Sequence, residues 1–411
     1  MKNAFNNTFE GLTVLVTGHT GFKGSWLSIW LEQLGAKVIG YSLEEPPTNP
    51  SNFALSKIGD RIVDVRGDVR DLQKLKIVLN HYKPELVFHL AAQPILLKSY
   101  EDPKVTFDTN AGGTVNILEA VKNSDSVKAV VCITTDKVYK NKEWVWGYRE
   151  HDELGDTDPY AASKAMAELA IHSYRESFFN NTKHGGKPVK VASTRAGNVV
   201  GGGDFADFRL IPDSMKAMIA EKPIELRNPL NVRPWQLVLE PLSGYLVLAE
   251  KLLKDPFDHH TRAWNFGPKN SKGITAGEIA DMIVELWGGG SWVNVGTNAA
   301  KKESNLLMLD WSAAHHHLGW QPVYDIKETL GEIVAWHKHY AKQLKENPNK
   351  INMYDICVEQ IRKYTKKAKE IGLHWAQDKS FDNDKSIAGF SSSKKSGGVK
   401  KLSKKSKKAK K

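Results

Sequence analysis

The stretch TVLVTGHTGFKGSWL, residues 13–27, decides the fold of this chain. Its first part, Thr13–Thr17, has the composition of a short buried strand, and the segment that follows, Gly24–Leu34, has the apolar spacing of a helix. Glycines occupy positions 18, 21 and 24 of the turn between them. In such a turn the first glycine permits a tight bend, the second lets the backbone approach a pyrophosphate, and the third allows close packing of helix on strand. Because a helix N-terminus also attracts anions, we predict a dinucleotide-binding loop.

The first half of the chain continues this alternation of strands and helices. Strands are predicted at Thr13–Thr17, Lys37–Tyr41, Arg61–Val65, Leu86–Ala91, Lys128–Thr134 and Val189–Arg195. Helices are predicted at Gly24–Leu34, Leu72–His81, Gly113–Lys122 and Tyr160–Phe178. Strands that alternate with helices build parallel sheets. The predicted fold class is therefore α/β, a Rossmann-type doubly wound parallel sheet with a smaller α/β substrate-binding domain toward the C-terminus.

We expect four regions along the chain. Residues 1–200 form the dinucleotide-binding domain, and residues 201–345 form mainly the substrate-binding domain, with some elements returning to the first sheet. An amphipathic helix is predicted at Ile326–Gln343 within the second region. A helical appendage over 346–375 and a disordered Lys-rich tail over 376–411 follow it.

The net charge of +11 arises from the end of the tail. Residues 391–411 contain ten lysines and no acidic residue, so the remainder of the chain is close to neutral. We expect no specific nucleic-acid partner, although the tail is suited to touch anionic surfaces. Only Cys132 and Cys357 are present, and no apolar run reaches the roughly 20 residues that span a bilayer. These features predict a cytoplasmic protein with buried, reduced cysteines.

A second pattern, Tyr160-Ala-Ala-Ser-Lys164, lies at the start of a predicted helix. Asp158-Pro159 has the residue types of an N-cap and a first helical position, so Lys164 shares the face of Tyr160. A lysine ammonium near a phenol favours the phenolate and lowers the phenol pKa. Such a pair is equally common on a solvated helix face, but together with the glycine loop it favours a catalytic site. Thr135, at the end of the fifth strand, offers a hydroxyl to the reacting oxygen beside Tyr160.

The glycine loop and the Tyr-x-x-x-Lys pair resemble those of the extended short-chain dehydrogenases/reductases, the family of NAD-dependent epimerases and dehydratases. The resemblance implies that Asp68-Val69 holds the adenine edge and that His89-Leu-Ala-Ala-Gln93 lines the nicotinamide side. It also implies NAD as the cofactor. NADP stays an alternative, because Tyr41-Ser42-Leu43 stands where an acidic residue would bind the ribose 2′-hydroxyl. The predicted cofactor-binding residues are Gly18, Thr20, Gly21, Phe22, Lys23, Gly24, Asp68, Val69, Ala91, Ala92 and Gln93.

The residues after Thr135 indicate the reaction. An acid directly after the hydroxyl, here Asp136, resembles the sugar-nucleotide 4,6-dehydratases, and Lys137 stands where many of them have Glu. The run TDKVYKNKEWVWGYRE, residues 135–150, is similar to the CDP-glucose 4,6-dehydratases among them, as are residues 18–26, 195–204 and 233–241. Two positions depart from that pattern: Leu237 replaces a histidine and Leu97 replaces an arginine.

This resemblance implies that CDP-glucose is converted to CDP-4-dehydro-6-deoxyglucose with no net redox change. Tyr160 would remove the 4-hydroxyl proton as the C4 hydride passes to the nicotinamide, and Thr135 and Lys164 would support the developing charge. Asp136 would protonate the departing 6-hydroxyl, and Lys137, if neutral, would take the C5 proton. The stored hydride would then return to C6.

The resemblance also implies where the substrate binds. The superfamily positions that hold the nucleotide diphosphate are occupied here by Asn198, Arg209, Arg227 and Arg233. Trp144 and Trp146 either wall the sugar pocket or pack in the core.

We expect no metal site in this protein. His315-His-His317 lies on a predicted helix, where successive side chains point about 100° apart and cannot converge on one ion. Asn265-Phe-Gly267 is predicted to be a turn near the substrate domain, with no assigned chemistry.

Two alternatives stay open from the sequence. One is a 4,6-dehydratase or 4-epimerase acting on another sugar nucleotide; the other is a non-catalytic dinucleotide-binding sensor or scaffold. The family resemblance further implies a homodimer through the helices near Val105–Lys122 and Tyr160–Phe178, and a role in the synthesis of surface polysaccharide such as lipopolysaccharide.

Overall fold

The computed structural model describes residues 3–179, 188–269, 273–296 and 307–377. Met1–Gln377 form one compact unit, so the division near residue 200 stays a prediction. Apart from its first two positions, the predicted Lys-rich tail lies outside the described residues. No helix in the described ranges is long and apolar enough to cross a membrane.

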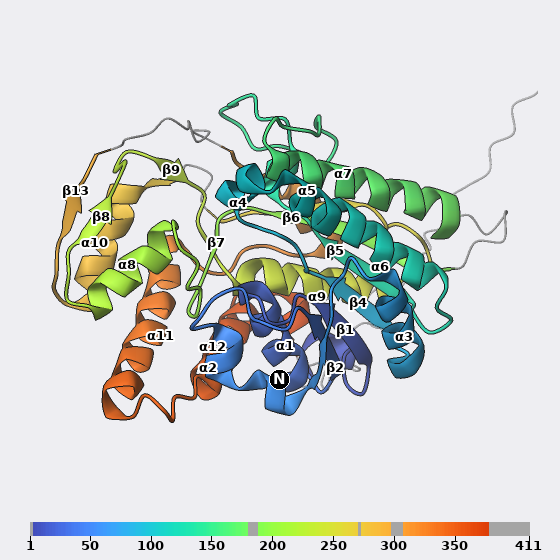
Figure 1. Cartoon of the computed structure of the whole chain (residues 1–411), viewed down its shortest axis with the longest axis horizontal. Helices are drawn as coiled ribbons and strands as arrows, with labels where there is room; N and C mark the ends of the chain where they lie inside the picture. The colour runs from blue at the N-terminus through green and yellow to red at the C-terminus, as the bar shows by residue number, and fades with distance from the viewer. Residues whose placement is uncertain (1–2, 180–187, 270–272, 297–306, 378–411) are drawn as a thin grey trace, which may run out of the picture. The chain divides into compact units, whose positions relative to one another are not determined.

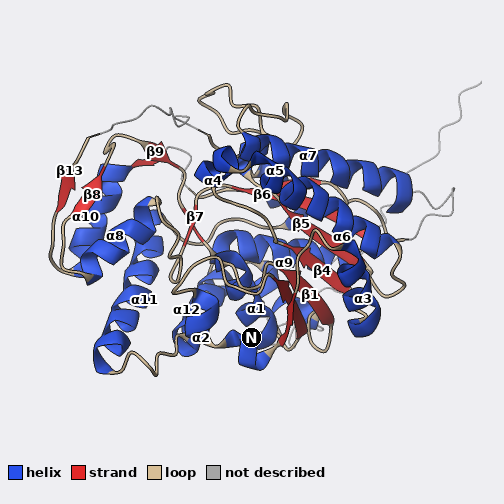
Figure 2. Cartoon of the chain, in the orientation of Figure 1, coloured by secondary structure: helices blue, strands red, loops and turns tan. Residues whose placement is uncertain are grey.

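A seven-stranded sheet organises the chain (Figures 1 and 2). Its strand order is β11-β6-β5-β4-β1-β2-β3, and every neighbouring pair is parallel. The strands are β1 Thr13–Thr17, β2 Lys37–Ser42, β3 Val63–Arg66, β4 Leu86–His89, β5 Ala129–Ile133, β6 Lys190–Ala196 and β11 Ala263–Phe266. The predicted α/β class with a parallel Rossmann-type sheet is confirmed.

Helices cover both faces of this sheet. One core cluster joins Leu15 and Ile39 to side chains of α3, α6 and α7, and the other joins Val14 and Val16 to α1, α9, α11 and α12. Successive strand residues thus serve opposite layers, because side chains alternate across a strand. The helices are α1 Phe22–Gln33, α3 Leu72–Tyr82, α6 Gly113–Lys122, α7 Pro159–Tyr174, α9 Leu239–Lys254, α11 Ile326–Glu346 and α12 Tyr354–Glu370.

Smaller elements complete the unit. Three two-stranded sheets pair β7 with β10, β8 with β13, and β9 with β12. Figure 1 shows β8, β13, α8 and α10 grouped beside α11, away from the seven-stranded sheet. These elements are α2 Asn52–Ser56, α4 Leu96–Glu101, α5 Pro103–Phe107, α8 Leu210–Ile219, α10 Ala276–Trp287, β7 Val199–Val200, β8 Ile224–Leu226, β9 Val232–Arg233, β10 Gln236–Leu237, β12 Ile274–Thr275 and β13 Trp292–Asn294.

The predicted turn at Asn265–Gly267 is wrong. Its first two residues belong to β11, the edge strand that pairs with β6. Asn265 is fully buried, and its Nδ2 donates to the backbone carbonyls of Tyr148 at 2.9 Å and Asp310 at 3.2 Å. The buried amide is tolerated because the fold satisfies its hydrogen bonds, which the local sequence does not reveal.

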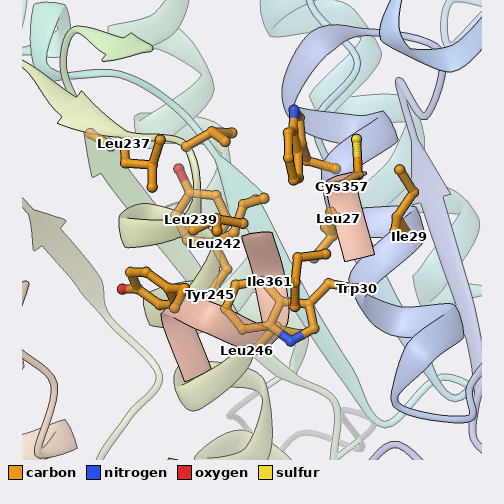
Figure 3. Close-up of a cluster of buried hydrophobic side chains, with 14 of the residues drawn as sticks. Leu27, Ile29, Trp30, Leu237, Leu239, Leu242, Tyr245, Leu246, Cys357 and Ile361 are labelled. Atoms are coloured by element: carbon orange, nitrogen blue, oxygen red, sulfur yellow. The ribbon is translucent and has the colours of Figure 1, made fainter. Parts of the chain in front are cut away.

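The helical appendage that we predicted over 346–375 packs into the main core. Figure 3 shows Ile361 of α12 beside Trp30 of α1 and Leu246 of α9, and Cys357 of α12 near Leu27 of α1. Cys132 is free and buried, as its apolar surroundings in the sequence predicted, and Cys357 is free and buried as well. The last helix therefore supports α1, the helix that begins at the glycine loop.

Candidate active site

The glycine loop has the geometry that its spacing predicts. Gly18 has a φ of +75°, and a Cβ there would lie 2.7 Å from the backbone N of Ala91. A Cβ on Gly24 would lie 2.1 Å from the carbonyl O of Gly18. Neither position accepts a side chain without displacing backbone. Gly21 is the N-cap of α1, so the first amides of that helix lie at the loop.

The loop lies at the point where the strand order reverses. β1 is flanked by β4 on one side and by β2 on the other. Open α/β sheets bind nucleotides in the crevice outside the carboxyl ends of the strands at such a reversal. The carboxyl ends of β1 and β4 carry the glycine loop and Ala91-Ala92-Gln93, so these predicted cofactor residues border that crevice.

Buried polar side chains hold the loop backbone. His19 is fully buried, with Nε2 2.9 Å from Oδ1 of Asp64 and Nδ1 3.0 Å from Oγ of Ser42. The Thr20 amide donates to the same Ser42 oxygen at 3.3 Å. Burial lowers the pKa of His19, although Asp64 opposes this. Ser42, at the end of β2, therefore stabilises the loop.

The segment after β4 is fixed by hydrogen bonds to its neighbours. The Ala91 amide donates to Oγ1 of Thr17 at 3.2 Å. The Gln93 amide donates to Oδ1 of Asn110 at 2.8 Å, and Nδ2 of Asn110 donates to the Gln93 carbonyl at 3.1 Å. Both ends of the predicted nicotinamide-side segment are thus held in place.

The predicted adenine-side pair follows β3. The Asp68 carboxylate accepts hydrogen bonds from the Arg70 amide at 2.8 Å and from Nε of Arg70 at 2.9 Å. The Tyr41 hydroxyl donates to the Asp68 carbonyl at 2.9 Å. Val69 is buried, and a Cβ on Gly113 would lie 2.8 Å from its Cγ2. β2, β3 and α6 therefore fix this pair together.

α7 begins where the sequence predicts. The Asp158 side chain accepts a hydrogen bond from the Ala161 amide at 2.8 Å, and Pro159 is the first helical residue. Tyr160 therefore falls in the first turn, is 9% exposed, and lies close enough to the Thr135 side chain for that side chain to act on its pKa. We predicted that the Tyr160 phenol and the Thr135 hydroxyl meet at the end of β5, and the structure places them together there.

The pKa of Tyr160 differs from our prediction. Burial raises the pKa of Tyr160 to about 12, with a further rise from Asp136, while the hydrogen bond with Thr135 and the charge of Arg209 oppose the rise. We expected Lys164 to lower this pKa. Its ammonium instead donates to the carbonyl of Ile133 at 3.2 Å, so desolvation of the phenolate dominates.

A buried lysine, Lys164, and a partly buried one, Lys23, have lowered pKa values. Burial and the charge of Lys23 lower the pKa of Lys164 to about 8, against the opposing charges of Cys132 and Glu168. Burial and the charge of Arg209 lower the pKa of Lys23 to about 8 as well, while Asp136 raises it. Lys23, which we predicted to bind the cofactor, therefore also acts on the catalytic carboxyl group.

The Asp136 carboxyl group interacts with the charges of Lys137 and Lys23. It is 7% exposed, and the Thr135 hydroxyl donates to its Oδ1 at 2.9 Å. Burial raises the pKa of Asp136, although Lys137, the hydrogen bond from Thr135 and the charge of Lys23 oppose the rise. A Cβ on Gly197 would lie 2.1 Å from Oδ2 of Asp136, so only glycine leaves room for this carboxyl group. Such a group has the properties of a general acid.

The four predicted substrate residues divide into two pairs. Asn198 follows Gly197, has a φ of +36°, and accepts a hydrogen bond from the Gln236 amide at its carbonyl. Nη1 of Arg209 lies 3.1 Å from Oδ2 of Asp204, and the arginine acts on Tyr160 and Lys23. Asn198 and Arg209 therefore border the catalytic residues.

The other pair lies in the smaller elements. Arg227 lowers the pKa of Asp213 in α8, which burial raises overall. Nη1 of Arg233, in β9, donates to Oδ1 of Asn231 at 2.9 Å, and Arg233 lines a small pocket with Trp235. Within the described residues, the contacts seen for Arg227 and Arg233 are with the smaller elements and not with the predicted catalytic residues.

The positions that depart from the family pattern lie in different surroundings. Leu237 is 2% exposed in the main core, where Figure 3 shows it near Leu239 and Leu242. Leu97 is 36% exposed on α4. Of the two tryptophans, Trp144 stacks on Tyr148 with ring centroids 5.3 Å apart, while Trp146 is 59% exposed.

Sequence reasoning missed two residues that support Tyr160. Nδ2 of Asn110 donates to Oγ of Ser163 at 2.9 Å, and that hydroxyl donates to the Tyr160 carbonyl at 2.8 Å. Ser163 lies between Tyr160 and Lys164 in the sequence, three residues after Tyr160. The Tyr-x-x-x-Lys pattern therefore already indicated that Ser163 shares the helix face of Tyr160. Asn110 lies in a π-helical turn, Asp108–Gly112, that no local pattern indicates.

The three consecutive histidines lie in another π-helical turn, Ala314–Leu318. His315 packs against Trp311 and His317 packs against Trp264, so the two rings point to different neighbours. Across the described parts of the chain, no group of three or more His, Cys, Asp or Glu side chains is placed to hold a metal ion.

Comparison with known proteins gives consistent matches. A family model described as GDP-mannose 4,6 dehydratase matches residues 15–333. The chain is 48% identical to a CDP-glucose 4,6-dehydratase of Salmonella typhimurium, over 82% of this chain and 93% of that protein. It is 27% identical to a dTDP-glucose 4,6-dehydratase of Streptomyces griseus, over 79% of this chain and 94% of that protein.

Solved structures agree on the fold. The crystal structure of a Thermotoga maritima UDP-glucose 4-epimerase with UDP-glucose matches with a TM-score of 0.69 at 21% identity, over 80% of this chain and 99% of that chain. A Bacillus anthracis dTDP-glucose 4,6-dehydratase in complex with NAD matches with a TM-score of 0.67 at 24% identity, over 82% of this chain and 99% of that chain.

Proposed function

The chain belongs to the GDP-mannose 4,6-dehydratase family, and from this premise we propose that it converts CDP-glucose to CDP-4-dehydro-6-deoxyglucose. The observation that carries the proposal is Asp136, a buried carboxyl group with a raised pKa in the same site as Tyr160 and Lys164. Oxidation at C4 needs a hydroxyl, a phenol and an amine, whereas loss of water also needs an acid. The 48% identity to a CDP-glucose 4,6-dehydratase supports the choice of substrate.

NAD is the cofactor in this proposal. The loop fits its pyrophosphate, because Gly18 and Gly24 leave no room for side chains and the N-terminus of α1 lies at the loop. Bound NAD supplies a hydride acceptor and, in its oxidised form, a positive ring charge. The residues that would hold it are Gly18, Thr20, Gly21, Phe22, Lys23, Gly24, Asp68, Val69, Ala91, Ala92 and Gln93.

Tyr160 takes the proton from the 4-hydroxyl of the sugar. Its pKa of about 12 in the protein alone means that nearby positive charge must stabilise the phenolate during the reaction. Arg209 contributes part of this charge from the protein side. Thr135, whose side chain acts on the pKa of Tyr160, offers its hydroxyl to the same sugar oxygen.

Asp136 and Lys137 carry out the elimination. Burial raises the pKa of Asp136 and so favours the protonated carboxyl group, which can give its proton to the departing 6-hydroxyl. Lys137 is partly buried and follows Asp136 in a short 3-10 turn, where its charge acts on that carboxyl group. We assign removal of the C5 proton to Lys137.

Cations near Asp136 suit the substrate diphosphate. Arg209 and Lys23 repel each other through their charges, and a phosphate between them would relieve that repulsion. Asn198 adds an amide at the same edge of the site. Arg227 and Arg233 complete the proposed set from the smaller elements.

A panel of nucleotide-activated glucoses tests this function. Purified protein with NAD is expected to form a 4-keto-6-deoxy product from CDP-glucose faster than from the dTDP, UDP or GDP forms. Product is identified by mass spectrometry. A preference for another nucleotide would overturn the substrate assignment, and the absence of product from every member would favour a non-catalytic dinucleotide-binding protein.

A homodimer is part of the proposal. Apolar side chains on α5 and α7 are exposed in the described unit: Val105 by 36%, Met166 by 49% and Leu169 by 60%. Exposed apolar side chains on adjacent helices are typical of a surface that a second copy covers. Because α7 also carries Tyr160 and Lys164, such an interface would brace the catalytic helix.

Replacing Leu169 by Glu is expected to convert the dimer to a monomer, because a buried unpaired carboxylate destabilises an interface by several kcal/mol. Light scattering after size exclusion measures the mass. Ile77→Glu, at a 67% exposed apolar position on α3, is the matched control and should keep the dimer mass. A dimer that survives Leu169→Glu would place the interface elsewhere.

A further inference from the structure

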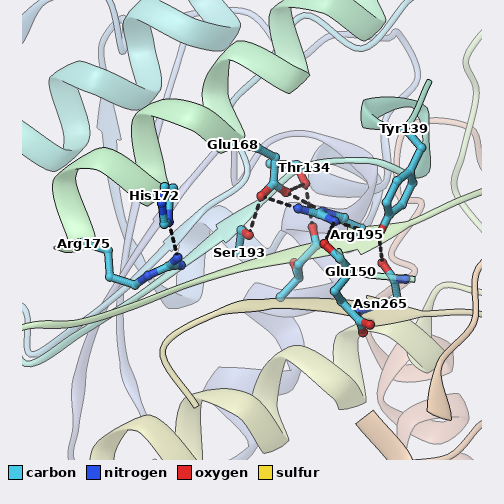
Figure 4. A network of polar contacts seen from close by, with 10 residues as sticks. Thr134, Tyr139, Glu150, Glu168, His172, Arg175, Ser193, Arg195 and Asn265 are labelled. Carbon is cyan, nitrogen blue, oxygen red and sulfur yellow. Dashed lines mark hydrogen bonds and ion pairs between the residues drawn. The ribbon is translucent and has the colours of Figure 1, made fainter. Parts of the chain in front are cut away.

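A buried ion pair joins α7 to β6, and Figure 4 shows it with its hydrogen-bond partners. Glu168 of α7 is 5% exposed and Arg195 of β6 is 3% exposed. Nε of Arg195 lies 3.0 Å from Oε1 of Glu168, and Nη2 lies 3.0 Å from Oε2. The same carboxylate accepts the hydroxyls of Thr134 at 2.6 Å and Ser193 at 2.7 Å. Four donors therefore satisfy Glu168, and burial does not leave it with an unpaired charge.

Glu168 and its partner Thr134 each lie close in sequence to proposed catalytic residues. On α7, Glu168 lies one turn after Lys164 and two turns after Tyr160, on the same face. Directly after β5, Thr134 precedes Thr135. One side chain thus joins the helix that carries the phenol and the ammonium to the strand end that carries the hydroxyl.

Arg195 extends the connection to the carboxyl acid. Its Nη1 donates to the Tyr139 hydroxyl at 2.7 Å, and Tyr139 directly follows the turn of Asp136. That hydroxyl donates to Oδ1 of Asn265 at 2.8 Å. Two residues beyond Arg195, Gly197 packs against Asp136. The turn that carries Asp136 is therefore held from both β6 and β11.

We infer that Glu168, through its pair with Arg195, is a positioning residue: it holds Tyr160, Thr135 and Asp136 in the arrangement that the reaction needs. This inference rests on the proposed function. Glu168 does not touch the reacting atoms and acts through Thr134, Arg195 and the register of α7. A buried ion pair is weak support for stability by itself, and here its value lies in fixing three segments relative to one another.

The charge of Glu168 also acts on the pKa of Lys164, so that its loss should change the pH dependence of activity as well as stability. Lys164 is faced by Lys23 from α1, His89 from β4, Cys132 from β5 and Glu168 from α7. Glu168 raises the pKa of Lys164 and so keeps its ammonium charged to higher pH. Without this carboxylate, Lys164 loses its proton at lower pH, and activity that depends on the ammonium declines earlier as pH rises.

The main test is Glu168→Gln. The new amide N–H groups would face hydroxyl and guanidinium donors, so the arrangement around Thr134 and Arg195 must shift. We expect kcat to fall about 100-fold, the effect of a displacement near 1 Å in a catalytic geometry, while KM changes little. The alkaline limb of the kcat profile should move to lower pH by about one unit.

Glu240→Gln is the matched control. Glu240 of α9 is also buried, at 1% exposure, and accepts hydrogen bonds from the Val323 amide at 2.9 Å, the Tyr324 amide at 2.7 Å and the Tyr364 hydroxyl at 2.6 Å. These partners are not among the catalytic residues. The control should lower the melting temperature but keep kcat and the pH profile.

A second pair of variants keeps the inference testable if Glu168→Gln fails to fold. Thr134→Val removes the hydroxyl that binds Glu168, whereas Thr134→Ser retains it. We expect Thr134→Val to lower kcat about tenfold, equivalent to about 1.4 kcal/mol of barrier, and Thr134→Ser to restore it.

The outcomes separate this inference from the proposed function. Suppose that the wild type converts CDP-glucose and that Glu168→Gln keeps the wild-type kcat and pH profile. The ion pair is then only structural, and the inference is wrong. If Glu168→Gln does not fold, an unchanged kcat and pH profile in Thr134→Val leads to the same conclusion. If the wild type itself converts no sugar nucleotide, the proposed function fails, and the inference fails with it.

Discussion

Tyr160→Phe is expected to abolish the first hydride transfer, with kcat lower by about 10³-fold or more, because a positioned acid–base group contributes about 10²–10⁴ to the rate. Phenylalanine keeps the ring in its buried site and removes only the oxygen that takes the 4-hydroxyl proton. A single-turnover experiment that follows the absorbance of reduced nicotinamide measures the step directly.

Tyr340→Phe is the control for this experiment. Tyr340 is 8% exposed on α11, so the same hydroxyl is removed from a buried ring in another helix. Its kcat should stay close to that of the wild type. Rapid reduction of nicotinamide by Tyr160→Phe would show that another group takes the proton.

Asp136→Asn is expected to stop the reaction one step later. Asparagine retains the shape and can still accept the hydrogen bond of the Thr135 hydroxyl, but it cannot donate the proton that the 6-hydroxyl needs. Overall turnover should fall by about 10²–10⁴-fold, while the first hydride transfer stays fast. Rapid quench should therefore capture a 4-keto-hexose that still bears its 6-hydroxyl.

The position of the block distinguishes the two variants. In Asp136→Asn, reduced nicotinamide should accumulate to about one equivalent per active site, whereas Tyr160→Phe should show none. If both variants stop before hydride transfer, Asp136 is needed for the geometry of Tyr160 rather than for the acid step, and its assignment here would be wrong.

The sequence predicted the local parts of the site because their signals are local. At positions 18, 21 and 24, the atoms that a side chain would meet belong either to the turn itself or to the segment after the adjacent strand β4. Asp158 and Pro159 mark the start of α7 by capping chemistry, which depends only on the first helical turn. These constraints placed Tyr160 and Lys164 correctly on one buried face.

Features that depend on distant partners were missed. Asn265 resembled a turn residue, yet it lies in a four-residue edge strand whose partner β6 comes much earlier in the chain. Asn110 supports Tyr160 only because the π-helical turn brings it to Ser163. Polar residues suggested that α12 was peripheral, but its apolar face packs against α1.

Electrostatics was the least predictable feature. The i, i+4 spacing of Tyr160 and Lys164 suggested a lowered phenol pKa, but the folded chain removes both groups from water, and desolvation raises the pKa of Tyr160 to about 12. Glu168 continues the same helical face, and its partner Arg195 lies on another strand. Burial and pairing of this kind require the tertiary structure.

Isotope tracing of the hydride tests the central claim most directly. With CDP-glucose deuterated at C4, the account predicts that deuterium appears at C6 of a 4-keto-6-deoxy product, while no reduced nicotinamide is released. Mass spectrometry and NMR locate the label. Stoichiometric release of deuterated reduced nicotinamide would identify a simple dehydrogenase, and deuterium returned to C4 would identify an epimerase; either result would contradict the dehydratase assignment.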